Sequence, residues 1–217
     1  MIEKKVIDKT FRMLLSLLAL LLISINASGQ FFIPDFKSNL NYNDSADLKK
    51  FMNTTLQNYD IAISLNFSSP WDTTVNMILY HKEGKWMQLK VFSDNPFDNN
   101  VYNTIKKDTI QQFYDLAWQG LINNHLFSIN SDSLNIRERK LADSTMEYFN
   151  VADGIVYGFC IVTKNKQRYF SIPEPETFLG WMPKNIDIED FITCKNIFLS
   201  LWGYEVNNKN DKIRKNK

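Results

Sequence analysis

The chain has 217 residues, of which 44% are hydrophobic and 14% aromatic, and its formal net charge is +1. A chain of this size and composition buries a hydrophobic core and forms one domain by default. The near-neutral charge gives little attraction to nucleic acid, so we expect no nucleic-acid partner. Two cysteines and two histidines provide no zinc-site spacing, so we expect no metal and no other cofactor.

Residues 1–29 have the parts of an export signal. Basic residues precede an apolar run at 13–23, which is shorter than the roughly 20 residues needed to cross a bilayer. Ala27 and Gly29 match the small residues that a signal peptidase reads. We therefore expect cleavage after Gly29, a secreted or periplasmic mature protein, and no stable membrane span once the signal is removed. A retained membrane anchor is the alternative, because two acidic residues dilute the positive start.

The rest of the chain is predicted to be a single α+β domain over 30–206, followed by a basic tail over 207–217. The tail interleaves lysine and arginine with asparagine, which is typical of a disordered, solvated end. Hydrophobic periodicity and turn residues then predict the elements of the domain. In chain order these are a helix at 44–58, a strand at 61–67, a hairpin of 75–82 and 85–92, a short strand at 100–105, a helix from 108, a loop over 130–143, a short strand at 148–151, a hairpin of 155–163 and 167–172, and a helix from 187 to 203.

These elements predict a single antiparallel sheet built from the two hairpins plus the strand at 61–67. Two or three helices are expected to pack it, with the N-terminal helix on the flank. The order hairpin and then helix occurs twice, so a duplicated ββα unit is one interpretation. The other is the ordinary alternation of elements in an α+β domain.

The first hairpin predicts which side chains share a face of the sheet. Closure by Glu83-Gly84 sets Tyr80 opposite Met87 on one face, because glycine tolerates the positive φ of a tight turn. Gln88 and Lys90 then point to the other face, as does every second residue of the strand. We therefore expect one side of the sheet to face water.

Both long helices have start signals. Asp108 is placed to cap the first, with Gln111 three residues later. Ile110 and Phe113 belong to the apolar stripe predicted for this helix, together with Tyr114, Ala117 and Leu121. Asp187 is placed to cap the last helix, with Ile186 and Phe191 at the spacing of a hydrophobic staple.

Cys160 and Cys194 are the two cysteines, and two thiols in an exported chain suggest a disulfide. Side-chain alternation places Cys160 on the face of its strand that carries the smaller residues. Cys194 lies near the apolar stripe of the last helix, so the thiols could bridge if that helix covers this smaller face. The alternative is two inert thiols in the core.

The sequence contains no G-x-S-x-G, H-E-x-x-H or C-x-x-C motif and no glycine-rich phosphate loop, so we assign no catalytic residue. We expect His81 to pair across strands with Trp86, and His125 to lie at the end of a helix. One group of acids could act as the acid and base of a hydrolase, although helix capping and solvation also explain it. These acids are Glu174, Glu176, Asp187, Glu189 and Asp190.

Several large aromatic residues fall in predicted loops or beside turns, where they either cover the edge of the core or contact a partner. The candidate contact residues are Trp71, Trp86, Phe178 and Trp181. We therefore expect an exported, noncatalytic binding or interaction module whose partner is a protein, a glycan or a small apolar ligand. The alternative is a small carboxylate-dependent hydrolase that acts on an extracellular polymer.

Overall fold

The computed structural model describes residues 31–39, 53–69, 72–93, 103–107, 110–151, 153–205 and 214–215. Contacts divide the chain into two compact units, Met1–Ile33 and Pro34–Lys217, and the second contains the elements that follow. The predicted signal at 1–29 and most of the predicted helix at 44–58 lie outside the described residues. Among the helices that are described, none combines the length and the apolar character needed to cross a bilayer.

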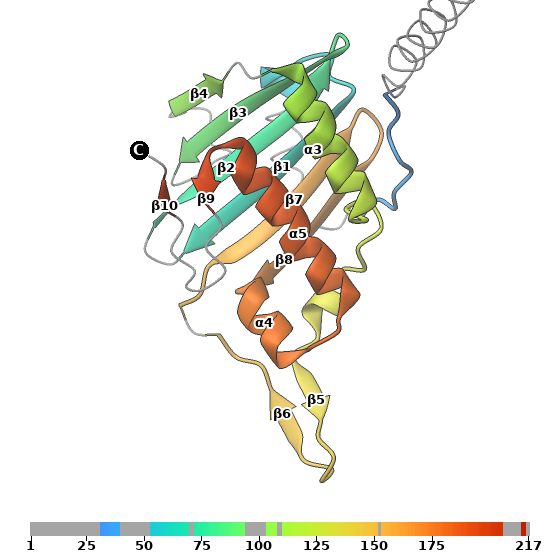
Figure 1. Cartoon of the computed structure of the whole chain (residues 1–217), viewed down its shortest axis with the longest axis vertical. Helices are drawn as coiled ribbons and strands as arrows, with labels where there is room; N and C mark the ends of the chain where they lie inside the picture. The colour runs from blue at the N-terminus through green and yellow to red at the C-terminus, as the bar shows by residue number, and fades with distance from the viewer. Residues whose placement is uncertain are drawn as a thin grey trace, which may run out of the picture. The chain divides into compact units, whose positions relative to one another are not determined.

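A six-stranded antiparallel sheet lies at the centre of the second unit, in the order β4-β3-β2-β1-β7-β8 (Figure 1). The predicted strand, the two hairpins and the single main sheet are thus confirmed. The strands are β1 (Ile61–Ser69), β2 (Asp72–Lys82), β3 (Lys85–Ser93), β4 (Asn103–Lys107), β7 (Val156–Thr163) and β8 (Gln167–Pro173).

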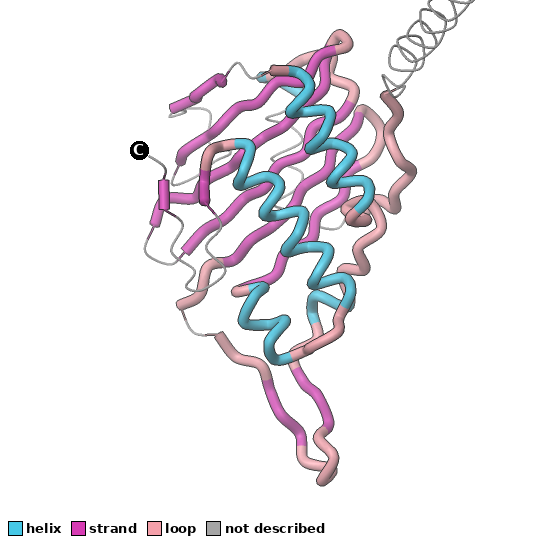
Figure 2. Tube along the Cα trace, viewed as in Figure 1, coloured by secondary structure: helices cyan, strands magenta, loops and turns pink. Residues whose placement is uncertain are grey.

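Two helices, α3 (Gln111–Asn123) and α5 (Ile186–Leu201), lie side by side across one face of this sheet (Figure 2). We call it the helix face. On α3 the Trp118 ring lies 5.0 Å from the ring of Trp86 on β3. On α5 the rings of Phe191 and Phe198 lie 5.3 and 5.5 Å from Phe159 on β7. Large apolar side chains therefore hold both predicted helices to the sheet.

The start of α5 differs from its prediction. Asn185 is the N-cap, and its side chain accepts hydrogen bonds from the backbone amides of Asp187 and Ile188. Asp187 lies in the first turn instead, and Ile186 is 67% exposed, so the staple with Phe191 does not form. At the other end, Gly203 has the positive φ expected just after the helix.

The opposite side of the sheet, which we call the second face, is also buried. Ala62, Ile78, Leu89, Cys160 and Val162 form its core, and Leu56 and Tyr59 from the segment before β1 pack against them. The predicted N-terminal helix therefore ends against this face rather than on the flank; of that helix, only 53–55 are described as helical.

The prediction of a wet side is wrong. Gln88 and Lys90 point to the helix face, as the register requires, but they are only 2% and 5% exposed. The alternation of polar and apolar residues correctly predicts which residues share a face, whereas burial depends on the helices that cover it.

The two hairpin-and-helix units have opposite hands. β2 and β7 lie on either side of β1 and both run antiparallel to it, so each hairpin has its first strand inside. The helices α3 and α5 nevertheless lie on the same face. In the two units the first strands run in the same direction and the helices lie on the same face, but the second strands lie on opposite sides of the first. Such units are mirror images, and no rotation superposes them. The repeated order of elements is therefore not a structural repeat.

A two-stranded arm projects from the sheet beyond the short helix α4 (Pro175–Trp181) (Figure 1). It consists of β5 (Glu138–Lys140) and β6 (Met146–Tyr148), and a single 3-10 turn at Ser133–Asn135 precedes it. The sequence predicted a loop over 130–143 and a strand at 148–151, so this arm was missed. In the predicted tail, Arg214–Lys215 (β10) pair with Tyr204–Glu205 (β9), and the other tail residues lie outside the described residues.

The outer edge of β8 is covered by the start of the second unit. Asn39 donates its backbone amide to the Gln167 carbonyl at 3.1 Å, and Ser38 donates its hydroxyl to the same carbonyl at 2.7 Å. The Asn39 carboxamide also bonds both the backbone amide and the carbonyl of Tyr169. Residues 34–39 therefore satisfy backbone groups that an edge strand would otherwise expose.

Both cysteines are free and buried. Cys160 belongs to the second face, whereas Cys194 lies on α5 and donates its thiol to the Asn124 carbonyl at 3.4 Å. Because α5 covers the helix face, the sheet separates the two thiols. The disulfide suggested by the sequence is thus absent from the structure, which has the two core thiols of the alternative.

Candidate ligand-binding cavity

A cavity of about 520 Å³ opens at the end of the second face, beside the β2–β3 turn. Its walls come from the segment before β1 on one side and from the two strands of the hairpin on the other. The lining residues are Thr55, Leu56, Tyr80, Lys82, Glu83, Met87 and Leu89.

Apolar side chains form part of the cavity wall, beside the polar side chains of Thr55, Lys82 and Glu83. Register places Tyr80 directly opposite Met87, and Leu89 lies two residues further along the same face of β3. Leu56 closes the wall from the other side. Burial raises the pKa of Tyr80 above the ordinary tyrosine value, and its hydroxyl, protonated at neutral pH like that of any tyrosine, can donate a hydrogen bond.

The rim of the cavity is polar and follows from the turn. Glu83 and Gly84 both have positive φ, 51° and 74°, as a two-residue type I′ turn requires. This turn sets Lys82 directly opposite Lys85, so both lysines project on the side of Tyr80. Lys82 Nζ donates to the Leu56 carbonyl at 3.0 Å and so links the two walls.

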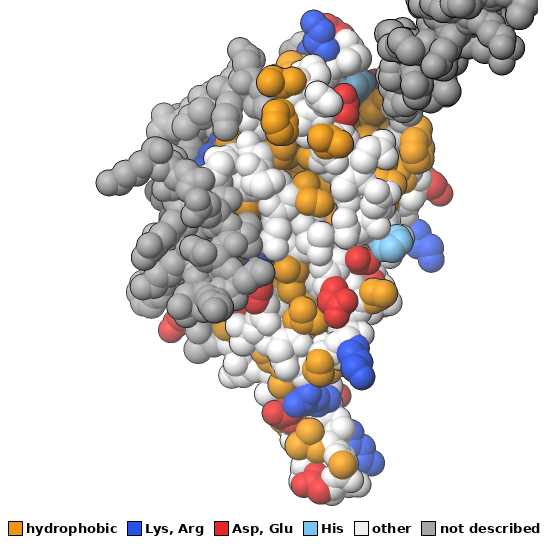
Figure 3. All heavy atoms as spheres, in the orientation of Figure 1, with side chains coloured by type: hydrophobic (Ala, Val, Ile, Leu, Met, Phe, Trp, Pro, Cys, Tyr) orange, Lys and Arg blue, Asp and Glu red, His pale blue; other side chains and the backbone are white. Residues whose placement is uncertain are grey.

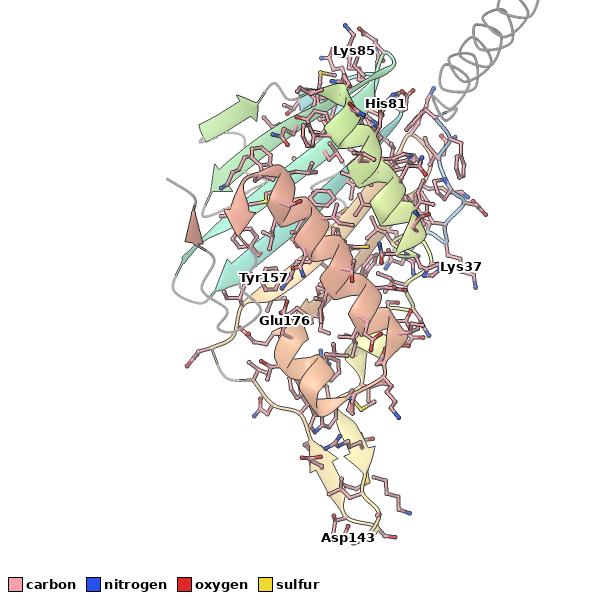
Figure 4. All side chains as sticks on the ribbon, viewed as in Figure 1. Lys37, His81, Lys85, Asp143, Tyr157 and Glu176 are labelled. Atoms are coloured by element: carbon pink, nitrogen blue, oxygen red, sulfur yellow. The ribbon has the colours of Figure 1, made fainter. Side chains whose placement is uncertain are left out.

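His81 lies beside the cavity but does not line it. Its side chain is on the helix face, where Nδ1 lies 2.6 Å from Asp60 Oδ2 and the ring lies 5.0 Å from that of Trp86. Figure 4 shows His81 and Lys85 at the same end of the hairpin. The predicted cross-strand pair of His81 with Trp86 is confirmed, and its burial beside α3 indicates a structural role.

Four of the five acids considered for a hydrolase have structural partners. Glu176 pairs with Lys195, which is buried and whose Nζ also lies 4.5 Å from the centre of the Tyr157 ring (Figure 4). The other partners are the Ile155 amide for Glu174, the Asn130 amide for Asp187 and His125 for Asp190. Within the described ranges, no three metal-ligating side chains are grouped to hold an ion.

The predicted aromatic contact residues do not form one surface. Trp86 and Phe178 are buried, which removes them from any contact surface, and Trp71 lies outside the described residues. Trp181 is half-buried and stacks on Phe178 at 5.6 Å, with the Arg139 guanidinium 5.1 Å from the centre of its ring. Phe178 and Trp181 therefore anchor the base of the β5–β6 arm.

An apolar row on α3 is exposed instead. Ile110, Phe113 and Leu116 are 67%, 58% and 64% exposed, and Figure 3 shows hydrophobic side chains gathered over this helix. The sequence predicted Ile110 and Phe113 in the buried stripe. That part of the prediction is wrong because the helix turns Tyr114, Trp118 and Leu121 toward the sheet.

No protein-family model matches the chain, and no curated protein shows significant sequence similarity to it. The cavity itself was missed by the sequence analysis, although the lysines on either side of the Glu83-Gly84 turn were a visible signal at its rim.

Proposed function

We propose that the protein is an exported, noncatalytic binding module that holds a small apolar ligand in the cavity beside the β2–β3 turn. The observation that carries this proposal is the shape and chemistry of the cavity. Its volume of about 520 Å³ lies within the roughly 300–1,000 Å³ that is typical of small-molecule sites. Apolar side chains line part of the cavity, and small-molecule sites also use a few polar groups to fix the orientation of the ligand.

Other features support a small ligand over the remaining candidates. A glycan site usually offers exposed aromatic faces, and two of the four aromatic candidates are buried. A hydrolase needs two carboxyl groups that face a common substrate, whereas Glu174 and Glu176 are engaged by a backbone amide and a lysine. These contacts favour a noncatalytic role.

Binding can be tested with the neutral fluorophore N-phenyl-1-naphthylamine, whose emission rises in an apolar site. We expect saturable binding of one molecule per chain. Met87→Trp adds bulk to the cavity wall and should weaken binding about tenfold or more, which corresponds to about 1.4 kcal/mol. Met146→Trp, on the exposed strand of the arm, makes the same exchange and should leave the affinity unchanged.

Thermal unfolding of both variants shows whether they retain the fold. Absence of saturable binding to the natural protein, or equal affinity in a folded Met87→Trp variant, would contradict the proposed site. Export is tested separately by N-terminal sequencing of the protein from a bacterial host: a mature chain that begins at Gln30 in the periplasm or medium supports it, and a chain that begins at Met1 in the cytosol contradicts it.

A further inference from the structure

We infer that the ligand of the cavity is an amphipathic monoanion, with its apolar body against Tyr80, Met87 and Leu89 and its acidic head at Lys82 and Lys85. This inference rests on the proposed function and adds the chemical class of the ligand. A carboxylate or sulfonate on a hydrocarbon or aromatic body has the required chemistry.

The first support is a pair of like charges beside the cavity: Lys82 lines it, and Lys85 lies across the hairpin from Lys82. Lys82 and Lys85 are directly opposite in the register, and like charges in that position destabilise a hairpin. Lys82 donates to a backbone carbonyl rather than to a carboxylate, and Lys85 has no acidic partner among the residues that the structure describes. An anion between the two ammonium groups would remove this repulsion.

The second support is a comparison with the other hairpin. Its turn also carries two lysines, Lys164 and Lys166, but there Lys166 forms an ion pair with Asp35. The lysines at the two turns therefore differ, because Lys166 has an acidic partner whereas Lys82 and Lys85 have none among the described residues.

The charge at the rim limits the ligand to one negative group. Glu83 lies between the two lysines in sequence and also lines the cavity, so the three residues carry a net charge of +1. A doubly charged head, such as a phosphate monoester, would leave one charge uncompensated next to the Glu83 carboxylate. A single carboxylate or sulfonate matches the rim, and lysine binds it as a compact point charge.

The experiment compares two probes that share an anilinonaphthalene body and differ in charge. N-phenyl-1-naphthylamine is neutral, and 8-anilinonaphthalene-1-sulfonate carries one negative charge. Both are titrated against the natural protein and against the double variant Lys82→Met with Lys85→Met. We expect the sulfonate to lose about tenfold in affinity in the double variant and to weaken with added salt, while the neutral probe changes less than about twofold.

Lys164→Met provides the matched control, because it removes an exposed lysine beside the turn of the other hairpin. It should leave the binding of both probes unchanged. Competition adds an independent measurement: decanoate should displace the sulfonate probe at lower concentration than decanol does, since the two share a chain and differ at the head.

The outcomes separate this inference from the proposed function. If neither probe binds saturably to the natural protein, the proposed function fails and this inference fails with it. If the neutral probe binds but the affinity of the sulfonate is the same in the natural protein and the double variant, the cavity remains a binding site and the inference of an anionic ligand is overturned. An equal loss in Lys164→Met, or equal competition by decanol, also overturns it.

Discussion

The side-chain amide of Gln111 bonds the backbone of Trp86 at two points. Its Oε1 accepts from the Trp86 amide at 2.8 Å, and its Nε2 donates to the Trp86 carbonyl at 3.0 Å. Among the described residues, β4 pairs with β3 as far as Gln88, and Gln111 bonds the β3 backbone two residues further along. Gln111, the first residue of α3, therefore makes the two backbone hydrogen bonds that a neighbouring strand would make, and these bonds fix where the helix begins on the sheet.

Replacing Gln111 with alanine should lower the free energy of unfolding by about 1–3 kcal/mol, because two buried backbone groups lose their partner. Gln112→Ala removes the neighbouring, exposed glutamine from the same helix turn and should change stability by less than about 0.5 kcal/mol. Urea denaturation of the two variants measures the difference. Equal stabilities would show that the Gln111 contact contributes nothing to the fold.

Stability should fall at high pH through Tyr59. Burial, with a smaller effect of the Cys160 thiol, raises the pKa of Tyr59 from 10.0 to about 12. Between these values the unfolded chain loses the phenol proton while the folded chain keeps it, so rising pH favours unfolding. Below pH 10 both states are protonated, and the residue adds no pH dependence.

The test compares the free energy of unfolding at pH 8 and pH 11 in the natural protein and in Tyr59→Phe. The loss between the two pH values should be smaller in the variant, although its absolute stability at pH 8 is lower because the hydrogen bond from Tyr59 to Asn53 Oδ1 is gone. Tyr148→Phe, at a residue that is 67% exposed, should keep the natural pH dependence. If the free energy of unfolding falls as much in Tyr59→Phe as in the natural protein between pH 8 and pH 11, the role of Tyr59 is refuted.

Asn76 is buried on β2, and neither Oδ1 nor Nδ2 of its side chain has a hydrogen-bond partner among the described residues. An unpaired buried amide costs free energy that an apolar side chain of similar size avoids. Asn76→Leu should therefore raise the free energy of unfolding by about 1 kcal/mol. Asn165→Leu, in the exposed turn of the other hairpin, should change it by less than about 0.5 kcal/mol.

Differential scanning calorimetry of the two asparagine variants gives the comparison. A destabilised Asn76→Leu variant would mean that the Asn76 carboxamide does have a partner in solution, for instance an ordered water molecule.

Both thiols should be unreactive in the native protein and reactive once it unfolds. Cys160 and Cys194 are buried, and burial raises the pKa of each thiol, so little thiolate is available for alkylation. Iodoacetamide should label neither residue in buffer and both in 6 M guanidinium without a reductant, as mass spectrometry reports. Failure to label the unfolded, unreduced chain would indicate a disulfide.

The sequence was sufficient for features that depend on near neighbours. The Glu83-Gly84 turn fixed the register of β2 and β3, and the pairing of His81 with Trp86 followed from it. Helix starts were less accurate, because Asn185 and Asp187 are both good capping residues and only backbone geometry decides between them.

Features that depend on distant contacts could not be predicted. The β5–β6 arm is anchored by Arg139, whose guanidinium bonds the Trp181 carbonyl 42 residues away. Burial of Gln88 depends on helices that follow it in the chain. The cavity forms only because Leu56 lies against the β2–β3 hairpin. The hydrophobic periodicity of one segment does not show which other segment it will pack against.

The cover that residues 34–39 place on β8 bears on how the protein can be shortened. The predicted signal cleavage after Gly29 would leave these residues on the mature chain. A version that starts after Asn39 would present the bare backbone of β8 to other molecules, and exposed strand edges drive chains to join sheet to sheet. We therefore expect a chain that begins at Pro34 to keep this cover, and a chain that lacks Ser38 and Asn39 to aggregate more readily.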